Sequence, residues 1–188
     1  MFENISSDLR RLSERQCSFR TLIRGLLAQG FQSIIVYRLF RWLKTKKIPA
    51  QPFRFICERF IEITTGISIP AECKIGKGFR IHHFGGIIFH PSVDIGENCT
   101  IYHEVTIGDK GGYGVAAKIG ENVMIGAGAK ILGEITIGNN CKIGANAVID
   151  KNIPDNSVAF GNPMILKRRK DNDIDIQDSI AEVAEVSV

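Results

Sequence analysis

The sequence predicts a mainly β fold, a parallel β-helix that follows an α-helical N-terminal segment. The first observation is an aliphatic residue that returns every six positions between residues 69 and 153. This six-residue series consists of Ile69, Ile75, Ile81, Ile87, Ile95, Ile101, Ile107, Ile119, Ile125, Ile131, Ile137, Ile143 and Ile149. A period of six matches neither the period of an α-helix nor that of an ordinary strand. Such hexapeptide periods are typical of parallel β-helices, whose short strands turn corners and stack coil on coil.

The second observation is a set of small or apolar residues that stand four positions after members of the series. These residues are Cys73, Cys99, Val105, Val123, Ala129, Ile135, Cys141 and Ala147. We expect each face of a three-sided coil to send two side chains inward per six residues. A run of ordinary β-hairpins is the alternative, but hairpins have no reason to hold one spacing for so long.

The series has two breaks. The interval between Ile87 and Ile95 is eight residues, which we interpret as a two-residue bulge. The interval between Ile107 and Ile119 is twelve residues and contains the glycine-rich residues 109–115. Paired glycines favour irregular structure, so the sequence predicts a loop that leaves the coil here. Loops that leave a rigid repeat often carry function.

The N-terminal third is predicted to be helical. Residues 1–18 are polar and charged and form a mobile or weakly helical lead-in, and residues 21–43 follow with a helical pattern. Gly30 indicates either two helices or a bend. Proline residues then break the pattern, and residues 53–63 resume it. The apolar faces of the two helical stretches consist of Phe31, Ile34, Ile35, Leu39 and Trp42, and of Phe53, Ile56, Phe60 and Ile63.

Three parts of the chain follow from this pattern. Residues 1–66 form a helical cap or assembly segment, residues 67–158 form the β-helix, which ends near Ile153 and Pro154, and residues 159–188 form a C-terminal segment with an acidic tail. The helical segment also offers a surface for assembly beyond a single oligomer of the β-helix.

The basic residues of the first helical stretch allow two interpretations that do not exclude each other. In the first, the helix caps the first coil, because the open end of a coil would expose unpaired strand edges. This helix contains Arg38, Arg41, Trp42 and Lys44. In the second, the same residues make peripheral contact with an anionic membrane surface. Arg38 and Arg41 make this stretch a poor transmembrane candidate.

Composition narrows the class of partner and the compartment. The chain has 188 residues with a formal net charge of +4, and this small excess does not predict nucleic-acid binding. Its five cysteines include no CxxC pair, so neither a disulfide framework nor a zinc site is predicted. The N-terminus lacks the apolar core of a signal peptide. We therefore expect a cytoplasmic protein that contacts, at most, the inner face of the membrane.

The four histidines are the main candidates for chemistry. They are His82, His83, His90 and His103. One coil of eighteen residues plus the bulge places His83 directly beneath His103. A neutral imidazole near pH 7 accepts a proton from an attacking hydroxyl. His82 and His83, if adjacent on a strand, point to opposite faces, and no spacing of metal ligands is present.

Three blocks of the sequence resemble the hexapeptide-repeat acyltransferases, and most of all their serine acetyltransferase branch. The blocks are residues 81–88 (IHHFGGII), 95–108 (IGENCTIYHEVTIG) and 125–133 (IGAGAKILG), and Gly161-Asn162-Pro163 is similar to the terminal motif of that superfamily. The resemblance covers roughly residues 65–168. It implies a left-handed parallel β-helix, acetyl-CoA as co-substrate, no metal, and a homotrimer with active sites between subunits.

The resemblance also implies roles for individual residues. His83 matches the general base, with His103 as its neighbour in the catalytic pair. The positions that match the coenzyme A site are Ala127, Gly128, Ala145, Asn162, Pro163, Lys167 and Arg168. The alanines would line the pantetheine arm, and the basic residues 167–170 would contact phosphates, although a solvated basic run is the simpler alternative.

Departures from the serine acetyltransferase pattern affect the acceptor. His82 and Ser68 stand where that branch has aspartates, and Val115-Ala116 stand where it has an Arg-His pair that binds serine. Neutral groups leave little to hold a zwitterion, whose burial needs ionic partners. Saccharide hydroxyls suit such a pocket better. The candidate acceptor-binding residues are His82, Tyr102, Glu104, Tyr113 and Ser68.

The leading hypothesis is therefore an acetyl-CoA-dependent O-acetyltransferase that modifies a saccharide unit or precursor of a capsule, exopolysaccharide or lipopolysaccharide. Serine O-acetyltransferase of cysteine biosynthesis is the first alternative. An amino-sugar nitrogen or a small xenobiotic is another acceptor to consider. From a different class, an inactive β-helix that serves as an assembly scaffold also fits the repeat, because Ser68 and His82 replace carboxylates.

Overall fold

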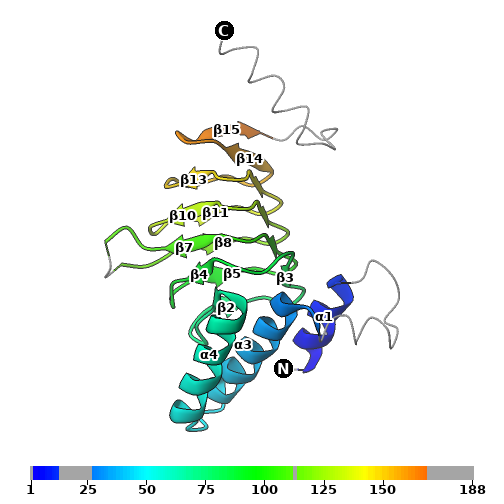
Figure 1. The fold of residues 1–188 in the computed structure, drawn as a ribbon. Helices are drawn as coiled ribbons and strands as arrows, with labels where there is room; N and C mark the ends of the chain where they lie inside the picture. The colour runs from blue at the N-terminus through cyan, green and yellow to red at the C-terminus, as the bar shows by residue number, and fades with distance from the viewer. Residues whose placement is uncertain (1, 13–26, 112–113, 169–188) are drawn as a thin grey trace.

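The computed structural model describes residues 2–12, 27–111 and 114–168, which form a stack of β-coils standing on helices (Figure 1). The described helices are α1 (Phe2–Leu12), α3 (Gln29–Thr45) and α4 (Gln51–Thr65). α4 ends at Gly66, whose φ of 66° lets the chain leave the helix and enter the first coil.

Fifteen short strands lie in the described part of the chain and form three sheets, one for each face of the coil. The first sheet contains β1 (Ile67–Ser68), β4 (Ile87–Phe89), β7 (Thr106–Gly108), β10 (Lys130–Leu132) and β13 (Val148–Ile149). The second contains β2 (Lys74–Ile75), β5 (Asp94–Ile95), β8 (Lys118–Ile119) and β11 (Thr136–Ile137). The third contains β3 (Arg80–Ile81), β6 (Thr100–Ile101), β9 (Met124–Ile125), β12 (Lys142–Ile143), β14 (Ser157–Phe160) and β15 (Ile165–Arg168). The predicted parallel β-helix with an α-helical N-terminal segment is confirmed.

The core of the coil is the stacked aliphatic series. Ile101, Ile107 and Ile125 are fully buried, as are the cysteines Cys99 and Cys141 at the predicted small inward positions. On the third sheet, the series residues lie directly above one another from coil to coil, because the strands pair in parallel without slipping; they are Ile81, Ile101, Ile125 and Ile143. All four cysteines in the described ranges are free thiols.

The bulge lies elsewhere than predicted. Phe89 pairs with Ile107, so Phe89 rather than Ile87 occupies the main inward position of its coil. Ile87 pairs with Ile67 and fills the smaller inward position two residues earlier. The two extra residues therefore fall between Ile81 and Phe89, at the corner that carries His82 and His83. The prediction failed because Ile87 and Phe89 are both apolar and both buried.

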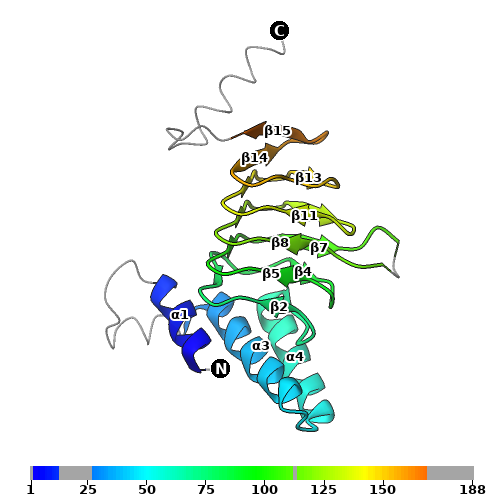
Figure 2. The same cartoon turned by 180° about the vertical axis from the view of Figure 1, so that it is seen from behind.

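The predicted loop between Ile107 and Ile119 is confirmed. Thr106 pairs with Lys130, 24 positions further along the chain, whereas Lys130 pairs with Val148 only 18 positions later. The additional residues project from the corner between β7 and β8 (Figure 2). Tyr113, a predicted acceptor-binding residue, lies outside the described residues.

The β-helix continues beyond its predicted end at Ile153 and Pro154. β14 pairs in parallel with β12, which adds one more strand to the third sheet. β15 then pairs antiparallel with β14 and ends the sheet. The acidic tail expected after residue 170 lies outside the described residues.

The first coil is capped by helices α1 and α3. The predicted interruption near Gly30 lies at Ala28, which separates the helical residue Leu27 from the start of α3. An added Cβ at Gly30 would lie 2.9 Å from the Ile81 side chain, so glycine allows α3 to approach the coil. Arg38 is buried, and its guanidinium donates hydrogen bonds to the Asp8 carboxylate and to the carbonyls of Ile75 and Gly76. The structure thus supports the cap interpretation.

The basic side chains proposed for membrane contact are engaged with this cap. Arg41 donates to the carbonyl of Glu72, and Lys44 forms an ion pair with the Glu72 carboxylate at 2.7 Å. Among the described helices, none is long and apolar enough to cross a membrane.

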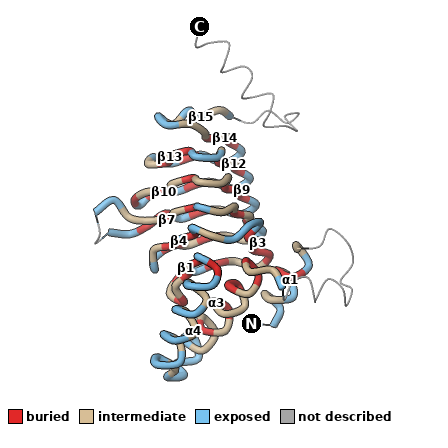
Figure 3. Tube along the Cα trace, in the orientation of Figure 1, coloured by how far each residue is buried: buried red, intermediate tan, exposed pale blue. Residues whose placement is uncertain are grey.

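The apolar face predicted for α4 is largely exposed, although the ring of Phe53 packs edge to face against Phe40 of α3. Phe53, Ile56, Phe60 and Ile63 are 60–75% exposed, and most of α4 is coloured as exposed or intermediate in Figure 3. In α3, Phe31 and Ile34 are buried as predicted, together with Tyr37 and Phe40. The other residues of the predicted face, Ile35, Leu39 and Trp42, are only half-buried.

Candidate active site

The candidate site begins at the wide corner between β3 and β4. His82 donates its backbone N–H to the carbonyl of Ile101, which is the last ladder bond before the chain turns outward. Gly85 and Gly86 have φ angles of 98° and 66°, a region that favours glycine. An added Cβ at Gly86 would lie 3.1 Å from the Cα of Glu104 in the next coil. The corner therefore protrudes but is held closely against the coil above it.

Four aromatic rings gather at this corner from two successive coils. The rings of His83 and His103 meet edge to face with centroids 5.7 Å apart, as the coil count predicted. His82 stacks on Tyr102 with an interplanar angle of 8° and a centroid distance of 4.7 Å. The centroids of His82 and His83 are only 4.8 Å apart. The expectation that these two histidines point to opposite faces is wrong, because they lie at a corner and not within a strand.

The environment of this cluster favours the neutral form of one imidazole, that of His82. Partial desolvation, and secondly the charge of Arg80, lower the pKa of His82. The Nδ1 atom of His103 is buried and has no hydrogen-bond partner among the described residues. His83 itself is exposed at the outer edge of the cluster. An accessible imidazole in this position can accept a proton from a bound hydroxyl.

An apolar groove of about 500 Å³ begins beside the cluster, at Tyr102, and follows the outer face of the third sheet. Its lining residues are Tyr102, Met124, Gly126, Ala127, Ile143, Gly144, Ala145, Val158, Phe160 and Gly161. Glycine is required in the floor of the groove because a side chain does not fit there: an added Cβ at Gly126 would lie 2.6 Å from the backbone N of Ala145. The groove thus contains two predicted coenzyme A residues, Ala127 and Ala145.

The remaining predicted coenzyme A residues lie near the same groove. Gly128 does not line it, but its backbone N–H donates to the carbonyl of His103 and links the groove to the cluster. Asn162 and Pro163 are exposed in the turn after Gly161. On β15, Lys167 pairs with Val158, a lining residue, and Arg168 follows it. Basic side chains therefore stand at the end of the groove away from the histidines.

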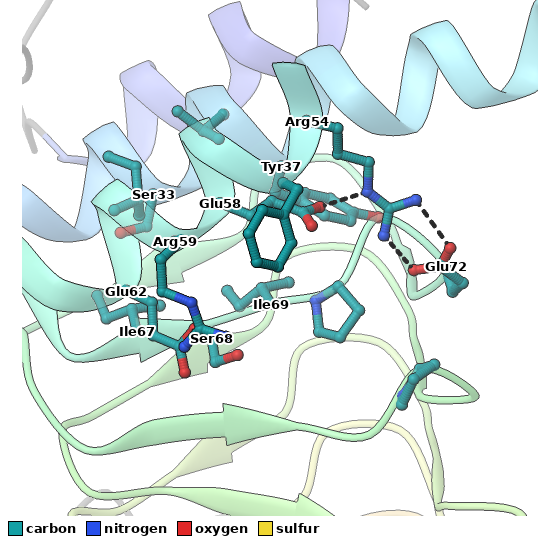
Figure 4. A pocket seen from close by; sticks show the side chains of 15 residues that line it. Ser33, Tyr37, Arg54, Glu58, Arg59, Glu62, Ile67, Ser68, Ile69 and Glu72 are labelled. Atoms are coloured by element: carbon teal, nitrogen blue, oxygen red, sulfur yellow. Dashed lines mark hydrogen bonds and ion pairs between the residues drawn. The ribbon is translucent and has the colours of Figure 1, made fainter. Parts of the chain in front are cut away.

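Two predicted acceptor-binding residues are less closely joined to the cluster. Ser68 lines a separate pocket between α4 and the first coil, together with Tyr37, Arg54 and Glu72 (Figure 4). Glu104 is exposed and lies against Gly86 at the wide corner. Within the described part of the chain, neither residue forms a hydrogen bond to an imidazole of the cluster.

Sequence reasoning missed Lys130 and the outer wall of the groove. The Nζ of Lys130 donates to the carbonyl of Glu104 at 2.6 Å and to the hydroxyl of Thr106, so it braces the strand that follows His103. Met124 stands directly before a series isoleucine and pairs with Lys142, which in turn pairs with Val158. The positions just before the series residues form the outer face of the coil, and this signal would have found the groove.

No group of three or more metal-ligating side chains is gathered among the residues that the structure describes.

Comparisons with known proteins agree with this geometry. A family model described as bacterial transferase hexapeptide (six repeats) matches residues 116–151. A serine acetyltransferase of Synechococcus elongatus is 32% identical over 166 residues, covering 87% of this chain and 67% of the relative. A putative colanic acid biosynthesis acetyltransferase, WcaB of Escherichia coli, is 39% identical over 110 residues, covering 58% of this chain and 65% of the relative. The crystal structure of a serine acetyltransferase from Brucella abortus in complex with coenzyme A has a TM-score of 0.80 at 26% identity, covering 90% of this chain and 68% of that one.

The coil, the corner histidines and the flanking groove define an acyl-transferring enzyme of the hexapeptide-repeat class. The chain belongs to the serine acetyltransferase-like branch of the hexapeptide-repeat acyltransferases, and it is an acetyltransferase.

Proposed function

We propose that this acetyltransferase moves the acetyl group of acetyl-CoA to a hydroxyl of a saccharide, a unit or precursor of a capsule, exopolysaccharide or lipopolysaccharide. The observation that carries this proposal is the ring cluster at the mouth of the groove. His82 and Tyr102 stack face to face beside His83, and the outer face of such a stack suits the apolar face of a sugar ring. Among the described residues, no carboxylate hydrogen-bonds to these rings.

In this proposal acetyl-CoA lies in the groove along the third sheet. The apolar lining around Ala127 and Ala145 would contact the pantetheine arm, and Lys167 and Arg168 at the far end would contact phosphates. The solved relative from Brucella abortus, a complex with coenzyme A, supports coenzyme binding by this fold. The thioester would then lie at the end of the groove marked by Tyr102.

The transfer needs one base and no covalent acyl-enzyme intermediate. His83 accepts the proton of the acceptor hydroxyl as its oxygen attacks the thioester carbonyl. Backbone amides stabilise the oxyanion that forms. The carbon–sulfur bond then breaks, and the proton passes from His83 to the departing thiolate of coenzyme A. His103, edge to face with His83, limits the orientations of the His83 ring.

The second candidate is serine O-acetyltransferase, which the relatives favour by name. Most of the matched relatives are serine acetyltransferases, and one solved relative is a complex with serine. Against this candidate, the positions expected to hold the charges of serine contain Ser68, His82, Val115 and Ala116. Ala116 is buried, and its N–H donates to the Ser92 hydroxyl. The WcaB relative supports a saccharide acceptor.

One assay separates the candidates. The protein is supplied with acetyl-CoA and either L-serine or a panel of oligosaccharides and nucleotide sugars, and release of free thiol is followed. We expect thiol release that depends on a saccharide. Turnover of L-serine alone would establish the second candidate, and transfer to an amino-sugar nitrogen would be identified by mass spectrometry of the product. Absence of thiol release with every acceptor would support the inactive scaffold.

Assembly and location follow from the same proposal. The resemblance to trimeric relatives predicts a homotrimer in which each cluster is completed by a neighbouring subunit. Free cysteines favour a reducing cytoplasm, and a lipid-linked saccharide acceptor would bring the enzyme to the inner face of the membrane.

A further inference from the structure

Two arginines, Arg80 and Arg11, here called the arginine pair, meet on the outer face of the third sheet below the histidine corner. Arg80 precedes the buried Ile81 on β3, so its side chain points outward, and it pairs with Thr100 of β6. Arg11 comes from α1, which lies beside β3 (Figure 1). Its guanidinium donates to the Thr100 hydroxyl at 3.2 Å and to the carbonyl of Gly78 at 2.7 Å. Because paired strands are about 5 Å apart, this guanidinium lies next to the side chain of Arg80.

The arginine pair has no counter-ion within the described part of the chain. Arg80 forms no side-chain hydrogen bond or ion pair with another described residue, and its Nε is buried without a partner. Asp8 lies near Arg11, but its carboxylate already accepts from the Arg38 guanidinium and from the N–H of Phe79. Buried polar atoms without a partner are rare, and like charges this close repel each other. A bound anion would remove that repulsion.

The positive charge of Arg80 acts on the groups at both sides of it. Desolvation, and secondly the charge of Arg80, lower the pKa of Arg11. The same two causes, in the same order, lower the pKa of His82. A positive charge that no described carboxylate compensates thus extends from α1 to the ring cluster. This part of the surface therefore attracts anions.

The arginine pair lies next to the stacked rings on which the proposed acceptor rests. Arg80 and His82 are alternate residues of one chain segment, so their Cα atoms are roughly 7 Å apart. Tyr102, which stacks on His82, follows Thr100 in the same way. The groove begins at Tyr102 and continues along the coils above. A sugar on the stack would therefore place an anionic substituent at the arginine pair, on the side away from the groove.

Charge favours a phosphorylated ligand over other anions. Two guanidiniums carry a charge of +2, which matches a diphosphate and exceeds the charge of a single carboxylate. Guanidinium groups also form paired, charge-assisted hydrogen bonds with phosphate oxygens. An amino acid would bring an ammonium group close to two cations, which repel it. A sugar attached to a nucleotide or to a lipid carrier through a diphosphate has the required charge and no cationic group.

We propose that Arg80 and Arg11 bind the diphosphate of a saccharide acceptor that is still attached to its nucleotide or lipid carrier. This inference rests on the proposed O-acetylation of a saccharide and narrows its acceptor to the activated precursor. Acetylation then precedes the glycosyl transfer that consumes the diphosphate-linked sugar. The finished, uncharged polymer lacks the group that the arginine pair recognises.

A binding measurement tests the site without any acceptor. The protein is saturated with coenzyme A, which fills the groove in the proposed mechanism, and inorganic diphosphate is then titrated by calorimetry. We expect diphosphate to bind and Arg80→Gln to weaken its binding by at least about tenfold, because charge-assisted hydrogen bonds are lost. Arg80→Lys keeps the charge and should weaken it less. The matched control is Lys74→Gln, because Lys74 precedes Ile75 on the second sheet, beside Asp94, and its loss should have no effect.

Steady-state kinetics test the acceptor itself. For the sugar that the thiol-release assay selects, the nucleotide-linked form, the lipid diphosphate-linked form and the free sugar are compared. We expect at least one diphosphate-linked form to have a KM at least about tenfold below that of the free sugar, and the form with the lower KM identifies the carrier. Arg80→Gln should raise this KM at least about tenfold and leave the KM for acetyl-CoA unchanged. Circular dichroism verifies folding, and if Arg80→Gln does not fold, Arg80→Lys and the wild-type comparisons decide.

Three results would overturn the inference. Diphosphate binding that disappears when coenzyme A is present would assign the arginine pair to the phosphates of the coenzyme. Equal weakening by Arg80→Gln and Lys74→Gln would show non-specific attraction. Equal KM values for free and diphosphate-linked sugar, unchanged in Arg80→Gln, would remove this acceptor and leave saccharide acetylation intact. By contrast, specific diphosphate binding without transfer to any saccharide would refute the proposed function, and with it this acceptor, while the anion site itself would stand.

Discussion

The coils before and after the 109–118 loop follow one plan, but only the earlier coils carry histidines. In the later coils, Lys118 pairs with Thr136 and Lys130 pairs with Val148, both 18 positions apart. In the earlier coils, Ile67 pairs with Ile87, 20 positions apart. All four histidines of the chain precede the loop. The two additional residues turn one corner outward, and the rings gather at that corner.

At the regular corners, the polar side chains hydrogen-bond to one another along the stack instead of facing a ligand. The side-chain amide of Asn122 donates to that of Asn140, and Asn140 donates in turn to Asn156. An added Cβ at Gly96 would lie 2.7 Å from the backbone of Gly120 directly above it. Corners this tightly stacked have no space for an acceptor. The regular coils therefore stabilise the fold, and the candidate site lies at the corner where the repeat is interrupted.

The largest effect is expected on removing the proposed base, His83, from the wide corner. His83→Asn should lower kcat by roughly 10²- to 10⁴-fold, because the acceptor hydroxyl loses its proton acceptor. The melting temperature should change little, since His83 is exposed. Thiol release from acetyl-CoA gives the rate. His90→Asn is the matched control: His90 lies at another corner, bonded to Ser92, and its loss should leave kcat within a factor of about two.

A substitution in the core of the regular coils should lower stability and leave activity nearly unchanged. Ile137 is fully buried, and Ile137→Ala should lower the free energy of unfolding by about 2–5 kcal/mol through lost burial and the cavity left behind. Activity per folded molecule should stay near wild type. Denaturant titration measures the stability. Ile88→Ala, where the side chain is 55% exposed, should cost less than about 0.5 kcal/mol. Equal losses from both substitutions would contradict the assigned core.

The wide corner offers a matched pair of glycines. Gly85 and Gly86 both have positive φ, but an added Cβ at Gly85 meets no atom within 4 Å, whereas at Gly86 it meets Glu104. Each alanine substitution should cost about 1–2 kcal/mol in backbone strain. Gly86→Ala should also displace the corner and lower kcat by about tenfold or more. Identical kcat values for the two variants would show that the corner tolerates displacement.

The smallest effect concerns the pocket between α4 and the first coil. The Arg54 guanidinium lowers the pKa of Glu72 to about 2 from its usual 4.5. A lowered carboxyl pKa stabilises the fold above the unfolded-state pKa, and this stability disappears as pH falls from about 4.5 toward 2. Glu72→Gln should therefore cost about 1 kcal/mol at pH 7. The difference from wild type should vanish near pH 2, as thermal melts across this range would show.

Sequence alone predicted most of the fold because the stacked core imposes its period on the chain. The contact of His83 with His103 also followed from counting, since parallel coils preserve register. The position of the bulge did not follow, because Ile87 and Phe89 are equally apolar and only pairing distinguishes them. The orientation of α4 could not be predicted either: a helical pattern reveals an apolar face but not what that face packs against.

The candidate site was predictable in part for the same reason. Ala127 and Ala145 lie in the groove because they occupy equivalent corners of successive coils. Ser68 falls in a different pocket, since α4 crosses over the first coil and encloses it there. The charge of Arg80 beside His82 and the bond from Lys130 to the carbonyl of Glu104 depend on side-chain directions that spacing does not specify.

The buried arginine of α3 has a consequence for the protein at high concentration. Within the stack, the carbonyl of Ile95 accepts a hydrogen bond from the N–H of Gly76 in the coil beneath. No coil lies beneath Ile75, and its carbonyl accepts from the Arg38 guanidinium instead. Arg38 thus occupies the place of the next strand. A β-ladder with an unoccupied end can recruit another ladder and grow into a fibre. Arg38, held in place by Asp8, closes that route to polymerisation together with Tyr37, Arg41 and Arg11, whose side chains donate to other carbonyls of the first coil.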